Sequence, residues 1–92
     1  MRTVIYKYPL RRLLEQTILM PALARPLSVA IVDGEFFVWA AVDPDARNVA
    51  RRFFIWPTGV TFPEGISDDR FLGTITTQEG LRVWHIFDGG EM

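Results

Sequence analysis

The side chains best suited to binding chemistry in this sequence are arginines that stand next to aromatic residues. Arginine makes up nine of the ten basic residues. Arg51 and Arg52 directly precede the aromatic segment 53–56, and Lys7 lies between two tyrosines. A guanidinium binds phosphate through paired hydrogen bonds, and an aromatic ring can stack on a base. This pattern predicts a site for a small anionic, nucleotide-like ligand. Its candidate residues are Lys7, Arg51 and Arg52 for phosphate, Tyr8, Trp56 and Trp84 for stacking, and Thr58 and His85 for hydrogen bonds.

The two neighbouring arginines cannot both serve one pocket on one sheet face. Successive side chains of a β-strand point to opposite faces, so Arg51 and Arg52 must diverge if they lie on a strand. An alternative is that the arginines are solvated residues of edge strands, where charge guards against aggregation.

Catalytic chemistry finds little support in the sequence. His85 is the only histidine, and cysteine is absent. Neither Ser28 nor Ser67 lies in a nucleophile-elbow sequence. The close carboxylate pairs, 43/45 and 68/69, lie in turn segments, where aspartate typically caps its own backbone. We therefore predict a non-enzymatic protein with no metal site and no cofactor.

The elements that must position these residues are predicted to be β-strands. With 92 residues and 49% hydrophobic residues, the chain is long enough for one core, so a single β domain is expected over residues 1–92. Short apolar runs alternate with closely spaced turn signals. We expect an all-β fold, or a β-rich fold with one short helical turn, built as a small antiparallel sandwich or barrel. The predicted strands are 2–8, 14–20, 27–33, 35–42, 50–56, 69–77 and 81–87.

Several turns can be placed in more detail. Asp33-Gly34 between two apolar runs predicts a two-residue type I′ hairpin. A second hairpin is expected around 78–80, and residues 88–90 read as a turn or tail. The segment 9–20 is ambiguous between a helical turn and a strand, and we favour an irregular turn followed by a strand.

Large apolar residues occur on both faces of at least three predicted strands. In strand 35–42, Phe37 and Trp39 alternate with Phe36 and Val38. A lone sandwich needs only one apolar face per sheet. We therefore expect a homo-oligomer, most simply a two-fold dimer; the alternative is that segment 9–20 covers one outer face.

Charge and hydropathy exclude some partners. With 10 basic and 11 acidic residues, the net charge is −1, which argues against binding to extended nucleic acid. The longest uncharged apolar run, 36–42, is about a third of a membrane-spanning length, so no membrane association is expected. The N-terminal segment lacks the apolar core of a signal peptide, which predicts the cytoplasm.

A string of short segments, in order, spans nearly the whole chain. It comprises Ile5–Leu10, Gln16–Pro21, Leu27–Val29, Gly34, Val38–Pro44, Arg52-Phe53, Thr58-Gly59, Pro63, Phe71–Thr74 and Val83–Phe87. This string resembles a family of small phage and prophage proteins of unknown function. Pro57 and Val60 depart from the glycine and histidine usual there. The resemblance implies a phage-encoded accessory protein made in the host bacterial cytoplasm.

Two functional hypotheses follow. The first is a binding protein that sequesters a nucleotide-derived ligand, such as a host immune signal, at or near a subunit interface. This hypothesis rests on an analogy with small β-rich phage inhibitors of host defence, which hold such signals between subunits. The second is a protein–protein interaction module, either an inhibitor of a host protein or a minor structural protein, anchored by exposed aromatic residues.

Overall fold

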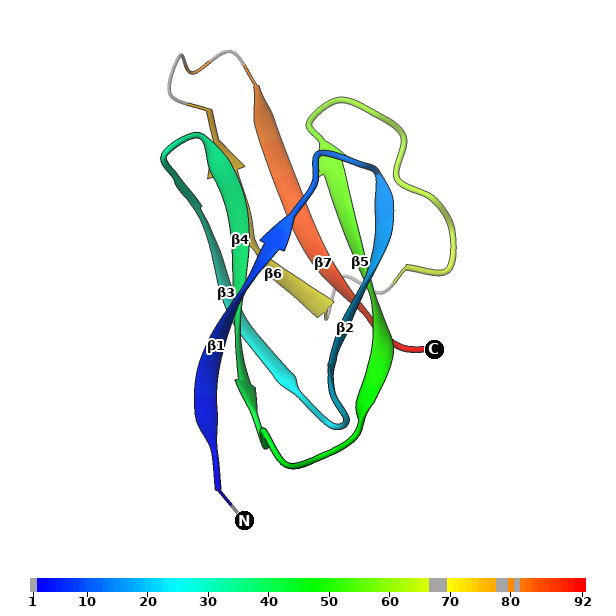
Figure 1. Cartoon of the computed structure of the whole chain (residues 1–92). Coiled ribbons are helices and arrows are strands. Elements are labelled where there is room, and N and C mark those ends of the chain that lie inside the picture. The colour runs from blue at the N-terminus through cyan, green and yellow to red at the C-terminus, as the bar shows by residue number, and fades with distance from the viewer. Residues whose placement is uncertain (1, 67–69, 78–79, 81) are drawn as a thin grey trace.

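Two antiparallel sheets build the protein (Figure 1). The computed structural model describes residues 2–66, 70–77, 80 and 82–92, and it holds no α-helix within them. The all-β prediction is therefore confirmed. The strands are β1 (Val4–Leu10), β2 (Glu15–Pro21), β3 (Arg25–Val32), β4 (Glu35–Val42), β5 (Asn48–Pro57), β6 (Phe71–Thr76) and β7 (Val83–Glu91).

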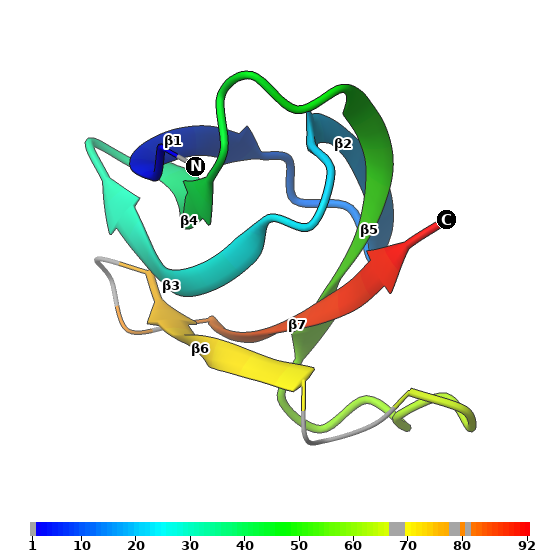
Figure 2. The same cartoon turned by 90° about the horizontal axis from the view of Figure 1, so that it is seen from below.

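The strands divide into a three-stranded sheet, β1-β4-β3, and a four-stranded sheet, β2-β5-β7-β6. Seen from below, the two sheets face each other around a common interior (Figure 2). They come closest where β3 meets β6: a Cβ added to Gly73 would lie 2.9 Å from the side chain of Val29. The predicted sandwich is confirmed.

The core follows the two-residue period of the strands. In β4, Phe36, Val38 and Ala40 are almost fully buried, while Phe37 and Trp39 point to the outer face and keep partial exposure. Val42 continues this row in β4, and Ala24 joins the core from the turn before β3. The rest of the core comes from the same alternation in other strands: Leu10, Met20, Phe53, Ile55, Ile75 and Ile86.

The hairpin predicted at Asp33-Gly34 is confirmed. Both residues have positive φ, 51° and 81°, as a type I′ turn requires. Val32 and Glu35 are paired directly beside it, so β3 and β4 are joined by the shortest common hairpin loop.

Segment 9–20 proves to be the end of β1, a loop and a strand. Residues 11–14 are irregular, and β2 then pairs with β5 as an edge of the four-stranded sheet. The Gln16 side chain accepts a hydrogen bond from the Arg11 N–H at 2.9 Å and donates to the Arg11 carbonyl at 2.6 Å. This segment extends a sheet rather than covering an outer face.

The prediction of a turn or tail at residues 88–90 was wrong. These residues lie in β7, which runs to Glu91 and pairs with β5 across a bulge. The prediction failed because glycines usually mark loops, whereas Gly89 and Gly90 here permit a bulge and a close contact within a strand. β6 and β7 pair antiparallel as predicted, and residues 69, 78–79 and 81 of this region lie outside the described residues.

Tyr8 on β1 gives the fold a predicted sensitivity to alkali. Burial against the core raises the pKa of Tyr8 above its ordinary value, with a smaller contribution from Tyr6. Because the folded state favours the neutral phenol, stability is unaffected below about pH 10 and falls as pH rises through the raised pKa. We expect Tyr8→Phe to lose less stability than the wild type in urea unfolding between pH 9 and 11. Parallel declines would contradict this assignment.

Candidate functional site

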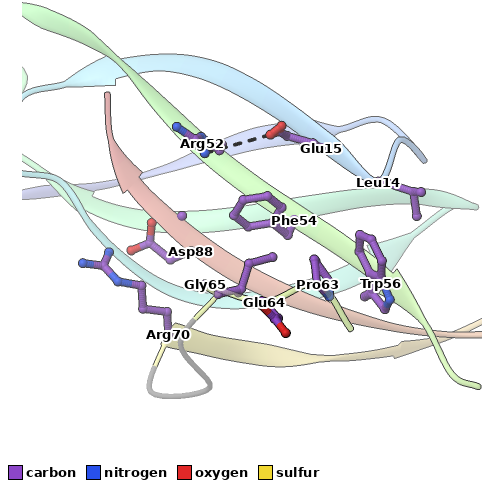
Figure 3. A pocket seen from close by; sticks show the side chains of 12 residues that line it. Leu14, Glu15, Arg52, Phe54, Trp56, Pro63, Glu64, Gly65, Arg70 and Asp88 are labelled. Carbon is purple, nitrogen blue, oxygen red and sulfur yellow. Dashed lines mark ion pairs between the residues drawn. The ribbon is translucent and has the colours of Figure 1, made fainter. Parts of the chain in front are cut away.

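A groove of about 550 Å³ lies on the outer face of the β2-β5-β7-β6 sheet (Figure 3). Alternate residues of β5 form its floor, because Phe53 and Ile55 point into the core and their neighbours point outward. Arg52, Phe54 and Trp56 therefore line the groove in a row.

The chain that follows β5 forms the opposite wall. The Trp56 indole N–H donates to the carbonyls of Val60 and Thr61 at 3.2 and 3.0 Å. The ring of Phe62 packs 6.0 Å from Trp56 and 4.8 Å from Phe87, centroid to centroid. These contacts hold the segment against the sheet, so that Pro63–Ile66 borders the groove.

Two glycines on β7 leave space for the Phe54 ring in the groove floor and for the guanidinium of Arg70. A Cβ on Gly89 would lie 2.8 Å from the ring of Phe54 and 3.0 Å from the backbone oxygen of Arg52. Gly90 has φ +83°, and a Cβ there would lie 2.9 Å from the guanidinium of Arg70. Phe54 and Arg70 thus take their places because β7 carries no side chain at these two positions.

Arginines and carboxylates both border the groove. The Arg52 guanidinium lies 4.0 Å from the Glu15 carboxylate, at the limit of an ion pair, and 5.9 Å from the Phe54 ring centroid. Arg70 lies on the other side, and Glu64 and Asp88 also line the groove. Both members of the Arg52–Glu15 pair are partly exposed, so solvent screens it strongly.

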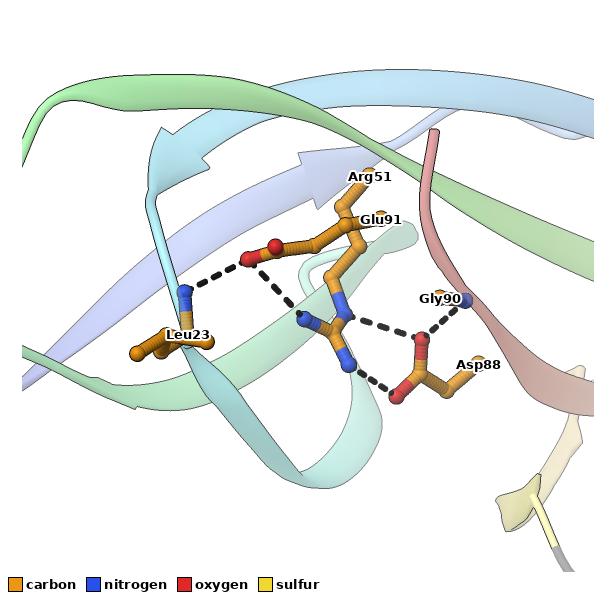
Figure 4. Close-up of polar contacts among 5 residues, drawn as sticks. All are labelled: Leu23, Arg51, Asp88, Gly90 and Glu91. Atoms are coloured by element: carbon orange, nitrogen blue, oxygen red, sulfur yellow. Dashed lines mark hydrogen bonds and ion pairs between the residues drawn. The ribbon is translucent and has the colours of Figure 1, made fainter.

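Arg51 does not line this groove. It is held by Asp88 instead (Figure 4). Its Nε and Nη2 donate to the two carboxylate oxygens at 2.9 and 2.7 Å, and both side chains are nearly buried. Asp88 also accepts a hydrogen bond from the Gly90 N–H at 2.8 Å, and Glu91 lies 3.8 Å from Arg51. The expectation that Arg51 and Arg52 diverge is confirmed, and Arg51 serves the fold.

The bulge at Gly89 creates this cluster. In a regular strand, residues three apart point to opposite faces. The extra residue in β7 shifts the register, so that Asp88 pairs with Phe53 and Glu91 pairs with Arg51. Both carboxylates can then face the same guanidinium, which the sequence spacing alone would have excluded.

Two other predicted residues meet at the far end of the same sheet. Thr58 Oγ1 lies 2.6 Å from His85 Nε2, and Thr74 Oγ1 lies 3.1 Å from His85 Nδ1. Both ring nitrogens of His85 therefore have a hydroxyl partner. This arrangement fixes the ring on the sheet surface, as a structural histidine would be fixed.

The remaining candidates lie elsewhere. Lys7 stands over Phe37 at 4.6 Å on the outer face of β1-β4-β3, and Tyr8 packs against the core. Trp84 lies on the inner side of β7, edge-on to Phe36 at 6.3 Å, with a buried indole nitrogen that has no hydrogen-bond partner among the described residues.

The structure thus brings Arg52 and Trp56 into one groove and leaves the other six candidates outside it. Sequence reasoning missed Phe54 and Arg70. Phe54 could have been found, because it lies two residues from both Arg52 and Trp56 and so shares their face. Arg70 gave no such signal, since its place beside Gly90 depends on the pairing of β6 with β7, which residue spacing does not reveal.

Among the described residues, no three or more histidine and carboxylate side chains are grouped so that they could hold a metal ion. No helix of that part of the chain has the length and apolarity to cross a membrane.

Fold and site together define a small two-sheet β-sandwich that carries a mixed aromatic and arginine-bordered groove on one outer face. The chain belongs to the domain family of unknown function DUF7352, whose model matches residues 1–91. No curated protein and no solved structure matches it.

Proposed function

We propose that this protein is a non-enzymatic binding protein that holds and sequesters a small anionic, nucleotide-derived ligand in the groove. The observation that carries the proposal is the row formed by Arg52, Phe54 and Trp56, with Arg70 on the opposite side. Aromatic rings offer stacking surfaces to a base, and a screened arginine is free to exchange its carboxylate for a phosphate.

The biological setting of the proposal comes from the resemblance to small phage and prophage proteins. In that setting the ligand is a host immune signal, and the protein acts in the host bacterial cytoplasm. Sequestration requires only tight binding, which stacking rings beside an arginine can supply.

The proposal includes a homo-oligomer. The outer face of β1-β4-β3 carries the rings of Phe37 and Trp39, 6.2 Å apart, and Ile5 is 62% exposed nearby. A second copy packed on this face would bury apolar surface that one chain leaves in water. The groove lies on the other sheet, so each chain would keep a complete site. The same face also favours the second candidate function, docking to a host protein.

A ligand screen tests the proposed function. Calorimetry and thermal unfolding with cyclic dinucleotides and ADP-ribose derivatives should find one that stabilises the protein, by about 2.7 kcal/mol at a ligand concentration of 100 Kd. Arg52→Gln should weaken that ligand about tenfold, because a charge-assisted hydrogen bond is lost. Lys7→Gln, a matched change on the other sheet, should have no effect. Folded protein that no member of the set stabilises would overturn the proposal.

Two further measurements separate the alternatives. Ligand recovered chemically unchanged after incubation supports sequestration over cleavage. Multi-angle light scattering tests the oligomer, since a monomer mass at micromolar concentration contradicts it. If the protein is a monomer that binds no nucleotide, the aromatic face of β1-β4-β3 becomes the better candidate for function.

A further inference from the structure

A second hollow adjoins the groove across the Arg52–Glu15 pair. It measures about 540 Å³ and is lined by Arg11, Glu15, Gln16, Thr17, Arg52 and Met92. Arg52 and Glu15 line the groove as well, so the pair forms a ridge between the two spaces. Arg52 can therefore contact one ligand that occupies both.

The two spaces differ in character. The groove has aromatic side chains, and its two arginines, Arg52 and Arg70, are matched by the carboxylates of Glu15 and Glu64. Asp88 also lines it, but its carboxylate is paired with Arg51. In the second hollow, the guanidinium groups of Arg11 and Arg52 face one side-chain carboxylate, that of Glu15, and no aromatic ring lines the hollow. Since like charges repel and desolvated anions need donors, a phosphate is better placed in the hollow than among the carboxylates of the groove.

Arg11 is positioned for this task by a buried neighbour. Gln16 is 7% exposed and pairs with both backbone groups of Arg11, at 2.9 and 2.6 Å. The backbone of Arg11 is thereby fixed beside the hollow, although its side chain is exposed. Within the described part of the chain, Arg11 forms no ion pair within 4.0 Å.

Arg52 can change partner at little cost. Its guanidinium is 4.0 Å from Glu15, and the two side chains are 38% and 53% exposed. An exposed pair of this length contributes little stability. A phosphate between Arg11 and Arg52 would make shorter, charge-assisted bonds, and the hydroxyl of Thr17, which pairs with Arg52 across the strands, could donate one more.

We infer that the hollow between Arg11 and Arg52 is the anion subsite. The ligand would then be an aromatic ring joined to a phosphate, as in a nucleoside monophosphate unit, with the ring over Phe54 and Trp56 and the phosphate beyond Arg52. The ring half of this inference rests on the proposed function, whereas the anion half stands on the hollow itself. Glu15 would oppose the phosphate and limit affinity.

Mapping by two-dimensional amide NMR tests the inference, with AMP, adenosine and inorganic phosphate as probes. We expect adenosine to shift the signals of Phe54 and Trp56, phosphate to shift those of Arg11 and Thr17, and AMP to shift both sets. AMP should bind more tightly than either fragment, since one molecule makes both sets of contacts.

Charge variants sharpen the test. Arg11→Gln should weaken AMP about tenfold and leave adenosine unchanged, because only the phosphate loses a charged donor. Glu15→Gln should strengthen AMP about threefold by removing a repulsive carboxylate. Arg25→Gln, an exposed arginine on the other sheet, is the matched control and should leave both affinities unchanged.

The outcomes separate this inference from the proposed function. If phosphate and AMP shift Arg70 while Arg11 and Thr17 stay still, the anion subsite is overturned and the groove stands. If phosphate shifts Arg11 but neither nucleoside shifts Phe54 or Trp56, the subsite stands and the nucleotide ligand is wrong. If no probe shifts either set, both are overturned.

Discussion

Asp88→Asn is expected to lower the free energy of unfolding by about 3–5 kcal/mol, because it removes the bidentate counter-charge of the nearly buried Arg51 and leaves only Glu91, 3.8 Å away. The wild-type pair is bidentate, at 2.9 and 2.7 Å, and its side chains are only 11% and 12% exposed. A small domain has about 5–15 kcal/mol in total, so the loss should be visible in urea unfolding at neutral pH.

The exposed pair between Arg2 and Asp45 is the matched control. Its atoms are 3.4 Å apart and its side chains are 64% and 76% exposed. Asp45→Asn should therefore change stability by at most about 1 kcal/mol. If Asp88→Asn costs no more than Asp45→Asn, the Arg51–Asp88 pair does not support the fold as argued.

The double variant Arg51→Met with Asp88→Leu adds a second readout. A buried ion pair can be replaced by apolar groups of similar volume with little loss, whereas breaking it leaves an uncompensated charge. We expect the double variant to be more stable than Asp88→Asn alone. Glu91 should not rescue the single variant, because its Oε2 lies 3.8 Å from Arg51, beyond hydrogen-bond distance, and already accepts a hydrogen bond from the Leu23 N–H.

Phe36→Ala and Phe37→Ala should differ sharply, although the two residues are neighbours on β4. Phe36 is 1% exposed and packs edge-on against Trp84 at 6.3 Å. Its truncation leaves a cavity between the sheets and should cost about 3–5 kcal/mol in urea unfolding. Phe37 points to the outer face, where its loss should cost about 1 kcal/mol or less in a single chain.

The same pair of variants addresses assembly. If a second copy covers the outer face of β1-β4-β3, Phe37→Ala should shift the light-scattering mass toward the monomer, while the folded fraction of Phe36→Ala should keep the wild-type mass. Equal stability losses for the two variants would contradict the division into an inner and an outer face of β4.

Local patterns were enough to predict much of the fold. The β-branched and aromatic runs predicted the strands, and Asp33-Gly34 predicted the hairpin between β3 and β4. Strand alternation also predicted that Arg51 and Arg52 would point to opposite faces. These inferences succeed because they depend on the geometry of neighbouring residues, which the sequence states directly.

The tertiary structure decided which of those residues form a site. The bulge at Gly89 aims Asp88 and Glu91 at Arg51, and Gly90 of β7 leaves room for Arg70 beside the groove. Such placements depend on register and loop path between distant segments, to which the spacing of residues along the chain gives no direct guide. The sequence by itself thus determined that arginines stand next to aromatic residues. Sheet packing determined that Arg51 supports the fold and that Arg52 borders the groove.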